Sequence, residues 1–239
     1  MSEWTEISWE TGSIPRTAGE PSAASRIHAD LWRRIVSLEL PPGLTLNRSE
    51  LARGYGTSQT PLREAMLRLA DEGLVDIFRQ SRTVVSLIDT ARMAETQLLR
   101  VALETELVRR IAETRPKEVL DRLGTLHDSL VRCAGDLGRM ARFYDIDRAF
   151  HRTLFDALDM RNLHDQLQAR SGHLMRIRRL ELPLAGKMKV IAREHEGILA
   201  AIRDGDAGLA RERLRVHISG SFERVHRLRE RYPHFFTGR

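Results

Sequence analysis

The first regular pattern along the chain is a set of apolar residues at helical spacing. They recur every three or four positions, at Ile27, Leu31, Ile35 and Leu38. This spacing predicts an amphipathic helix that begins near Ser25, and the Pro-Pro-Gly run at 41–43 ends it.

Two shorter helices are predicted directly afterwards. Asn47 and Glu50 have the spacing of a capping box, which opens a short helix. Ser58 can cap the next helix, which accepts Pro61 in its first turn and ends at Gly73.

A β-hairpin is predicted next. Residues 74–78 and 83–87 are rich in β-branched and apolar side chains, and the polar residues 79–82 lie between them. Three short helices with a tight turn between the second and third, followed by a hairpin, form the order of a winged helix-turn-helix domain. We therefore predict such a domain over residues 25–88, preceded by a flexible arm at 1–24 that shows no periodicity.

Beyond residue 88 only helical patterns continue. We expect six helices, at 90–114, 117–134, 139–158, 162–181, 186–203 and 207–230. A bundle of this size can bury its own core. The predicted fold is therefore mainly α, with an N-terminal winged helix and an all-helical second domain over residues 89–239.

Composition narrows the classes of function. The 239 residues are 41% apolar and 30% charged, which allows a packed core. No apolar run approaches the roughly 18 residues of a membrane span, and the acidic start is unlike a secretory signal, so we expect a cytoplasmic protein without membrane contact.

Cys133 is the only cysteine, so a metal would need His and carboxylate ligands. The net charge of +6 does not by itself indicate DNA binding, because residues 1–85, which include the predicted winged helix, hold ten Arg against eleven acidic residues.

The outward side chains early in the third helix are the candidates for reading DNA bases. A helix enters the major groove by its N-terminal residues, where Gln pairs with adenine and Arg with guanine. Side chains at the start of the second helix and in the wing can reach phosphate or the minor groove. The candidate set is Arg48, Ser49, Ser58, Gln59, Thr60, Arg63, Arg79 and Arg82. The alternative is that these residues form the solvated face of a small domain.

A metal-ligand pattern lies in the second domain. Asp147 and His151 are four positions apart on one predicted helix, so they share a face, and His195 and His217 stand on later helices. A carboxylate with three imidazoles suits Zn²⁺, Ni²⁺ or another divalent ion. Spacing alone leaves open a surface pair or a buried structural His instead.

Three stretches carry a resemblance to a known family: residues 40–43, 47–52 and 56–75. They resemble the N-terminal domain of GntR-superfamily transcriptional regulators. In that family the residues that match Ser58, Thr60 and Arg63 contact operator DNA, so the resemblance implies these roles here. The family usually has Arg where this chain has Gln59.

The second domain resembles FCD, the helical effector domain of FadR-like GntR regulators. The residues that carry this resemblance are Arg100, Glu104, Asp147, His151, Asn162, Glu194, His195 and His217. In metal-containing members an Asp and three His bind the ion, and Asp147, His151, His195 and His217 match them. The resemblance therefore implies a divalent metal site, with zinc or nickel favoured. Six expected helices rather than seven place the chain closer to the VanR-like branch.

An open metal position beside a buried Arg can receive a small carboxylate. Arg100 is the candidate for that Arg, with a salt bridge to Glu104 as the alternative. Asn162 can either hydrogen-bond the effector or cap a helix. We interpret the basic run at 176–179 as a solvated or interface face.

These observations predict a ligand-responsive transcriptional regulator and not an enzyme. We expect it to bind a pseudo-palindromic operator as a homodimer, or as paired dimers, and to sense a small organic acid at a metal. A repressor is favoured, since most relatives are released by effector. The alternatives are a metal-dependent hydrolase with an accessory winged helix, and a winged helix that binds a protein, with a structural metal.

Overall fold

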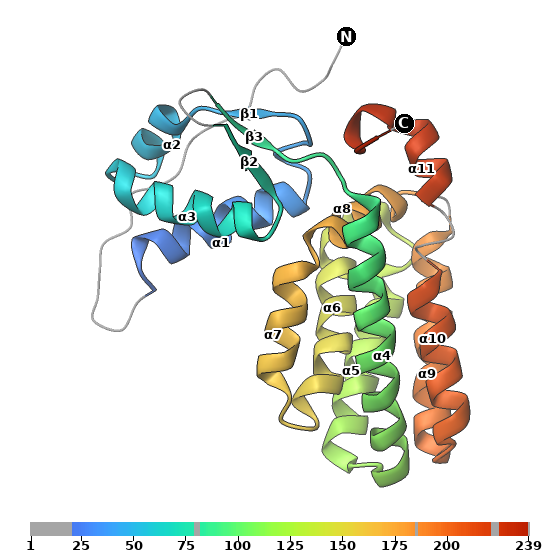
Figure 1. The fold of residues 1–239 in the computed structure, drawn as a ribbon. Helices are drawn as coiled ribbons and strands as arrows, with labels where there is room; N and C mark the ends of the chain where they lie inside the picture. The colour runs from blue at the N-terminus through green and yellow to red at the C-terminus, as the bar shows by residue number, and fades with distance from the viewer. Residues whose placement is uncertain (1–20, 79–81, 185, 221–224, 239) are drawn as a thin grey trace. The chain divides into compact units, whose positions relative to one another are not determined.

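The computed structural model describes residues 21–78, 82–184, 186–220 and 225–238. The chain divides into two compact units, one of residues 1–88 with 234–239 and one of residues 89–233. Figure 1 shows the helices and strands of both units. The boundary between the units falls after residue 88, and residues 234–239 group with the first unit.

In its described residues the first unit contains three helices and a small sheet. Its elements are α1 Ala23–Val36, β1 Thr45–Leu46, α2 Arg48–Gly54, α3 Gln59–Asp71, β2 Val75–Ile77 and β3 Thr83–Val85. The strands pair antiparallel in the order β1-β3-β2. The predicted helix-turn-helix and wing are confirmed, and β1, which is too short for a periodic pattern, is added to the hairpin.

Local contacts explain where these helices begin and end. Asn47 Oδ1 accepts the Ser49 and Glu50 backbone N–H groups at 3.0 and 3.2 Å, and Asn47 Nδ2 donates to Glu50 Oε1 at 2.8 Å. The half of the predicted capping box in which Asn47 accepts backbone N–H groups is therefore present, while Glu50 accepts from the Asn47 side-chain amide rather than from its backbone. Gly73 follows α3 with a φ of 73°, a conformation that favours glycine. The apolar faces of α1, α2, α3 and the sheet then meet in one core.

The end of the chain completes the first unit. Phe235 and Phe236 are buried, and Ile88 forms a parallel β-bridge with Phe236. The Ile88 N–H donates to the Phe235 carbonyl at 2.7 Å, and the Ile88 carbonyl accepts from Thr237 N–H at 3.0 Å. The chain therefore passes between the two units twice, after Ile88 and again after Pro233.

The second unit is helical throughout its described residues. Its elements are α4 Thr90–Thr114, α5 Lys117–Cys133, η1 Leu137–Arg139, α6 Met140–Asp156, α7 Arg161–Arg170, α8 Gly172–Glu181, α9 Lys187–Asp204, α10 Ala207–Ser219 and α11 Val225–Arg231. Helix α4 packs against α6, α9 and α10, and α5 packs against α6 and α9 (Figure 1). The turn η3 Pro233–Phe235 leads back to the first unit.

Two of the six expected helices are each interrupted. The stretch expected at 162–181 divides into α7 and α8 at Ser171, whose hydroxyl donates to the Leu167 carbonyl at 2.7 Å. Ser followed by Gly is a weak helix-forming pair, and the Ser side chain competes for backbone hydrogen bonds. The stretch expected at 207–230 contains α10 and α11.

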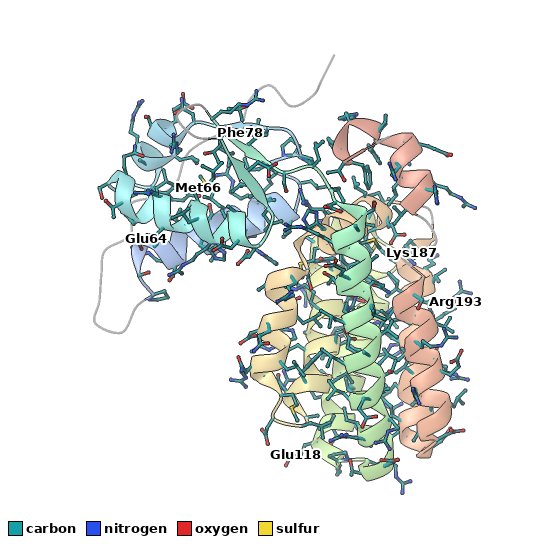
Figure 2. All side chains as sticks on the ribbon, viewed as in Figure 1. Glu64, Met66, Phe78, Glu118, Lys187 and Arg193 are labelled. Carbon is teal, nitrogen blue, oxygen red and sulfur yellow. The ribbon has the colours of Figure 1, made fainter. Side chains whose placement is uncertain are left out.

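The helices of the second unit enclose one large apolar core. Phe150 and Leu154 of α6 lie in it with Ile198 of α9 and Leu214 of α10, all fully buried. Charged side chains such as Glu118 and Arg193 are exposed on the outer faces (Figure 2).

None of the helices in the described ranges has the length and apolar character needed to cross a membrane.

Candidate metal centre and ligand cavities

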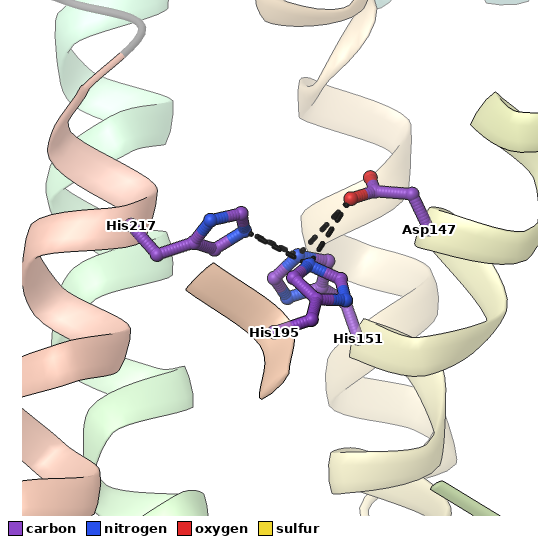
Figure 3. Close-up of side chains that lie close together, drawn as sticks. All are labelled: Asp147, His151, His195 and His217. Carbon is purple, nitrogen blue, oxygen red and sulfur yellow. Dashed lines mark hydrogen bonds and ion pairs between the residues drawn. The ribbon is translucent and has the colours of Figure 1, made fainter. Parts of the chain in front are cut away.

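Three helices bring the four predicted metal ligands together. Asp147 and His151 lie one turn apart on α6, His195 lies on α9 and His217 on α10 (Figure 3). All four side chains are buried. Each occupies the apolar stripe of its helix, as His195 does between Ile191 and Ile198, so helix packing alone directs them to one point.

The distances between the ligand atoms suit a small cation. Asp147 Oδ1 lies 3.3 Å from His195 Nε2 and 3.9 Å from His151 Nε2. His217 Nε2 lies 3.2 Å from His195 Nε2 and 3.3 Å from His151 Nε2. Ligands at about 2.1 Å from a tetrahedral ion are about 3.4 Å from one another. Three of the four distances are close to this value and all the ligand atoms lie within 4.8 Å of one another, so the group could hold one divalent ion.

Two further carboxylates orient the imidazoles. Glu104 Oε2 lies 2.6 Å from His151 Nδ1, and Glu194 Oε2 lies 2.7 Å from His217 Nδ1. Ionised carboxylates only accept hydrogen bonds, so both Nδ1 atoms carry the proton. In the neutral rings, the Nε2 atoms of His151 and His217 then face each other without a proton to share. A cation between them removes this unfavourable contact, and these outer carboxylates are typical of metal sites.

Asp147 also has an unused acceptor. Within the described residues, its Oδ1 atom forms no hydrogen bond of acceptable geometry although the side chain is buried. A buried carboxylate oxygen without a donor is costly, and a metal ion would compensate for it.

The protonation states are those that metal ligands need. Burial lowers the pKa of His151 and of His217, and the neighbouring imidazoles lower that of His217 further. Burial raises the pKa of Asp147, but Arg178 and the imidazoles outweigh burial and hold it well below its usual range. Burial likewise raises the pKa of Glu104, while Arg100 and His151 bring it down to about 2. The rings of His151 and His217 are therefore neutral, and the carboxylates of Asp147 and Glu104 charged, near neutral pH.

Arg178 is a site residue that the sequence did not reveal. Its Nη2 atom donates to Asp147 Oδ2, and its guanidinium lies 5.7 Å from the centre of the Tyr144 ring. Burial lowers the pKa of Arg178, but Asp147 raises it above its ordinary value.

The interpretation of residues 176–179 as a solvated or interface face is wrong for Arg176 and Arg178. Arg176 is fully buried and the Arg178 side chain is 13% exposed. The apolar neighbours Leu174, Ile177 and Leu180 were the available signal, because they predict a helix buried on several faces.

The two predicted effector residues have different surroundings. Arg100 is buried on α4 and donates from Nε to Glu104 Oε1 at 2.7 Å, so the alternative salt bridge is present. Arg100 nevertheless lines both cavities beside the metal ligands. Asn162 is exposed in the first turn of α7, is not the cap of that helix, and is not among the residues that line either cavity.

Two cavities flank the candidate metal ligands. The larger encloses about 430 Å³, part of it open to solvent. Its charged lining consists of Arg100, Arg148 and Arg178 with the Glu104 carboxylate, beside His151, and its apolar lining consists of Phe155, Leu167, Leu174 and Met175. The smaller, of about 330 Å³, reaches His217 and shares Arg100 and Arg178 with the larger.

The predicted DNA-reading residues that the structure describes are all exposed. They lie at the starts of α2 and α3 and after the wing turn: Arg48, Ser49, Ser58, Gln59, Thr60, Arg63 and Arg82. Ser58 is the N-cap of α3, although its side chain makes no capping hydrogen bond. Arg79 lies outside the described residues.

Two family models match the chain. Bacterial regulatory proteins of the gntR family match residues 23–85, and the FCD domain matches residues 95–220. These matches define a helix-turn-helix transcriptional regulator. The chain belongs to the GntR family, with an FCD domain as its second part.

Similar proteins are also transcriptional regulators and not enzymes. An uncharacterized HTH-type transcriptional regulator in an unstable DNA locus of Streptomyces ambofaciens is 36% identical over 212 residues, which cover 88% of each chain. The HTH-type transcriptional repressor RspR of Escherichia coli is 25% identical and covers 89% of this chain and 92% of its own. The solved structure of E. coli McbR/YncC has a TM-score of 0.71 at 21% identity, covers 87% of this chain and 99% of its own, and shows the fold alone.

Proposed function

We propose that this regulator is a repressor that binds a pseudo-palindromic operator as a dimer and senses a small organic acid at a metal-containing site. The proposal for DNA rests on the exposed start of α3, where Gln59 and Arg63 can reach base edges while Ser58 and Thr60 hold phosphates. RspR and other relatives named as repressors support the direction of control.

One observation carries the proposal for the metal. The Nδ1 atoms of His151 and His217 are held by Glu104 and Glu194, so their unprotonated Nε2 atoms meet at 3.3 Å. Asp147, His151, His195 and His217 would hold the ion, with zinc or nickel favoured by this ligand set. When bound, the metal supplies a positive charge and an open position for a carboxylate oxygen.

The larger cavity suggests the chemical class of the effector. Arg100, Arg148 and Arg178 line it together with Glu104 and His151, and guanidinium groups pair with carboxylates through two parallel hydrogen bonds. Its apolar lining residues, such as Phe155 and Met175, would contact a short hydrocarbon body. The effector would therefore be a small carboxylic acid with an apolar portion.

The metal and the acid can be tested on the purified protein. We expect about one divalent ion per chain, lost in His195→Ala and retained in the control His226→Ala, whose ring is exposed on α11. A panel of small carboxylic acids should then include one that raises the melting temperature only of metal-loaded protein. A folded protein that binds neither zinc nor nickel would refute the metal proposal.

The DNA activity requires a separate test. Selection from a random duplex library should enrich a sequence with two related half-sites, bound by two chains. Enrichment of no sequence would instead favour the winged helix that binds a protein. A stabilising acid should weaken binding to the selected duplex if the protein is a repressor released by effector.

A further inference from the structure

Helix α8 lies between the ligand site and the point where the chain enters the second unit. Its ten residues include eight buried ones, so both ends are packed against neighbouring elements. His173 stands in its first turn and Arg178 in its last. They are five positions apart, which is about 7.5 Å along the helix axis.

The first turn of α8 holds the beginning of the second unit. His173 Nδ1 accepts the backbone N–H of Asp89 at 2.9 Å and lies 2.9 Å from Arg176 Nη2. Both neighbours are donors, so His173 Nδ1 is unprotonated in this arrangement. Asp89 is the N-cap of α4 and directly follows Ile88, the last residue of the first unit before the boundary.

The last turn of α8 holds the ligand site. Arg178 donates to Asp147, one of the four metal ligands, and lines both cavities. A metal ion would draw the Asp147 carboxylate, and an acid in either cavity would compete with Asp147 for the guanidinium. Binding at this site therefore changes the bond that fixes one end of α8.

The second chain crossing is also attached to α8. Helix α11 packs against α8, and the chain continues from α11 through Pro233 to Phe235 and Phe236, which hold Ile88 within the first unit. Ile88 and Asp89 are adjacent in sequence. Ile88 is thus held by a segment that continues from α11, and Asp89 is held by α8 itself.

From this arrangement we infer that α8 couples the ligand site to the DNA-binding unit. Arg178 responds to binding at the ligand site, and His173 passes the change to Asp89. The inference rests on the proposed function. Packed helices shift between discrete positions more readily than they deform, so a change at Arg178 moves His173 as well. The shift weakens or strengthens the hydrogen bond from the Asp89 N–H to His173 Nδ1. It thereby changes the backbone position at the start of α4.

The transmission can be measured without any effector, by hydrogen–deuterium exchange of the Asp89 amide. Arg178→Gln breaks the pair with Asp147, and we expect exchange at Asp89 to become about 5-fold faster or more. The matched control is Arg179→Gln, which removes a neighbouring guanidinium of α8 that stacks on Tyr144 at 5.1 Å. Unchanged exchange in Arg178→Gln, or an equal effect of Arg179→Gln, would overturn the inference. Arg178→Lys keeps the charge and serves as the variant most certain to fold, with protection close to wild type.

The regulatory consequence is tested by a double-mutant cycle on affinity for the selected duplex. His173→Leu removes the acceptor for Asp89, whereas His173→Asn places an amide oxygen near the same position and should restore wild-type affinity. We expect His173→Leu and Arg178→Gln each to change affinity about 5-fold or more, and the double variant to add nothing to His173→Leu. Independent, multiplying effects would refute the coupling. If the chain binds no duplex, the proposed function fails, while the exchange experiment still decides the role of α8.

Discussion

Glu104→Gln is the substitution whose effect the structure defines best. The Glu104 carboxylate is 1% exposed, accepts from Arg100 Nε at 2.7 Å and lies 2.6 Å from His151 Nδ1. Glutamine has nearly the same shape but no charge, and its amide N–H₂ group would face a donor. The substitution therefore removes the counter-charge of a buried guanidinium and the acceptor of a metal-ligand imidazole together.

The expected loss of folding stability follows from the pKa of Glu104. A carboxyl whose pKa falls from 4.5 in the unfolded chain to about 2 in the folded protein contributes roughly 3 kcal/mol at neutral pH. Removing one partner of a buried ion pair costs about 3–5 kcal/mol, in agreement. We also expect zinc affinity to fall roughly 10- to 100-fold, as for other outer carboxylates of metal-bound His.

The pH dependence has a definite sign. Because the pKa of Glu104 is lower in the folded state, its contribution is present above about pH 4.5 and is lost as the pH falls towards 2. Urea unfolding of the metal-free protein should therefore show a smaller wild-type advantage over Glu104→Gln at pH 3 than at pH 7.

The matched control is Glu194→Gln. The Glu194 side chain is 32% exposed and orients His217, so its loss should weaken zinc binding while lowering metal-free stability by less than about 1 kcal/mol. Zinc affinity is measured by competition with a chelator. Equal metal-free stability of Glu104→Gln and wild type at pH 7, with equal zinc affinity, would refute the reasoning.

Three other substitutions test the first unit. Arg63→Ala should weaken binding to the selected duplex by about 1–3 kcal/mol, measured by fluorescence anisotropy, with no loss of zinc. The control Arg193→Ala, at an exposed position of α9, should leave duplex affinity unchanged. Asn47→Ala removes the α2 cap and should lower stability by about 1 kcal/mol in urea titration; a neutral result would contradict the capping role. Phe236→Ala leaves a cavity beside Ile88 and should cost about 3 kcal/mol of the first unit's stability by calorimetry, whereas an unchanged melt would show that the tail contributes little.

Much of the fold could be predicted because its determinants are local. The cap formed by Asn47 and Glu50 lies within four consecutive residues, and the helical spacing of Asp147 and His151 places them on one face wherever the helix packs. Spacing left His195 and His217 as candidates on later helices, and the family resemblance connected them to Asp147 and His151 of α6. The structure then placed all four within 4.8 Å of one another.

The features that were missed depend on tertiary contacts. Strand β1 has two residues and exists because β3 pairs with it. Phe235 and Phe236 are separated from Ile88 by most of the chain, so no pattern predicts that they meet. Arg178 was assigned to a solvated face because a run of Arg is usually exposed, but α8 is surrounded by other elements and brings it to Asp147.

The outer carboxylates explain why these buried charges are tolerated together. Glu104 lies on α4 and Glu194 on α9. These two carboxylates and the imidazoles of His151, His195 and His217 converge with Asp147 of α6 and Arg178 of α8. Each carboxylate is neutralised by a guanidinium or holds an imidazole, but the three Nε2 atoms and Asp147 Oδ1 remain directed at one another. A metal ion at that point would stabilise the folded bundle by its binding free energy. Because Arg178 pairs with the same Asp147, metal, acid and the position of α8 are then linked through one carboxylate.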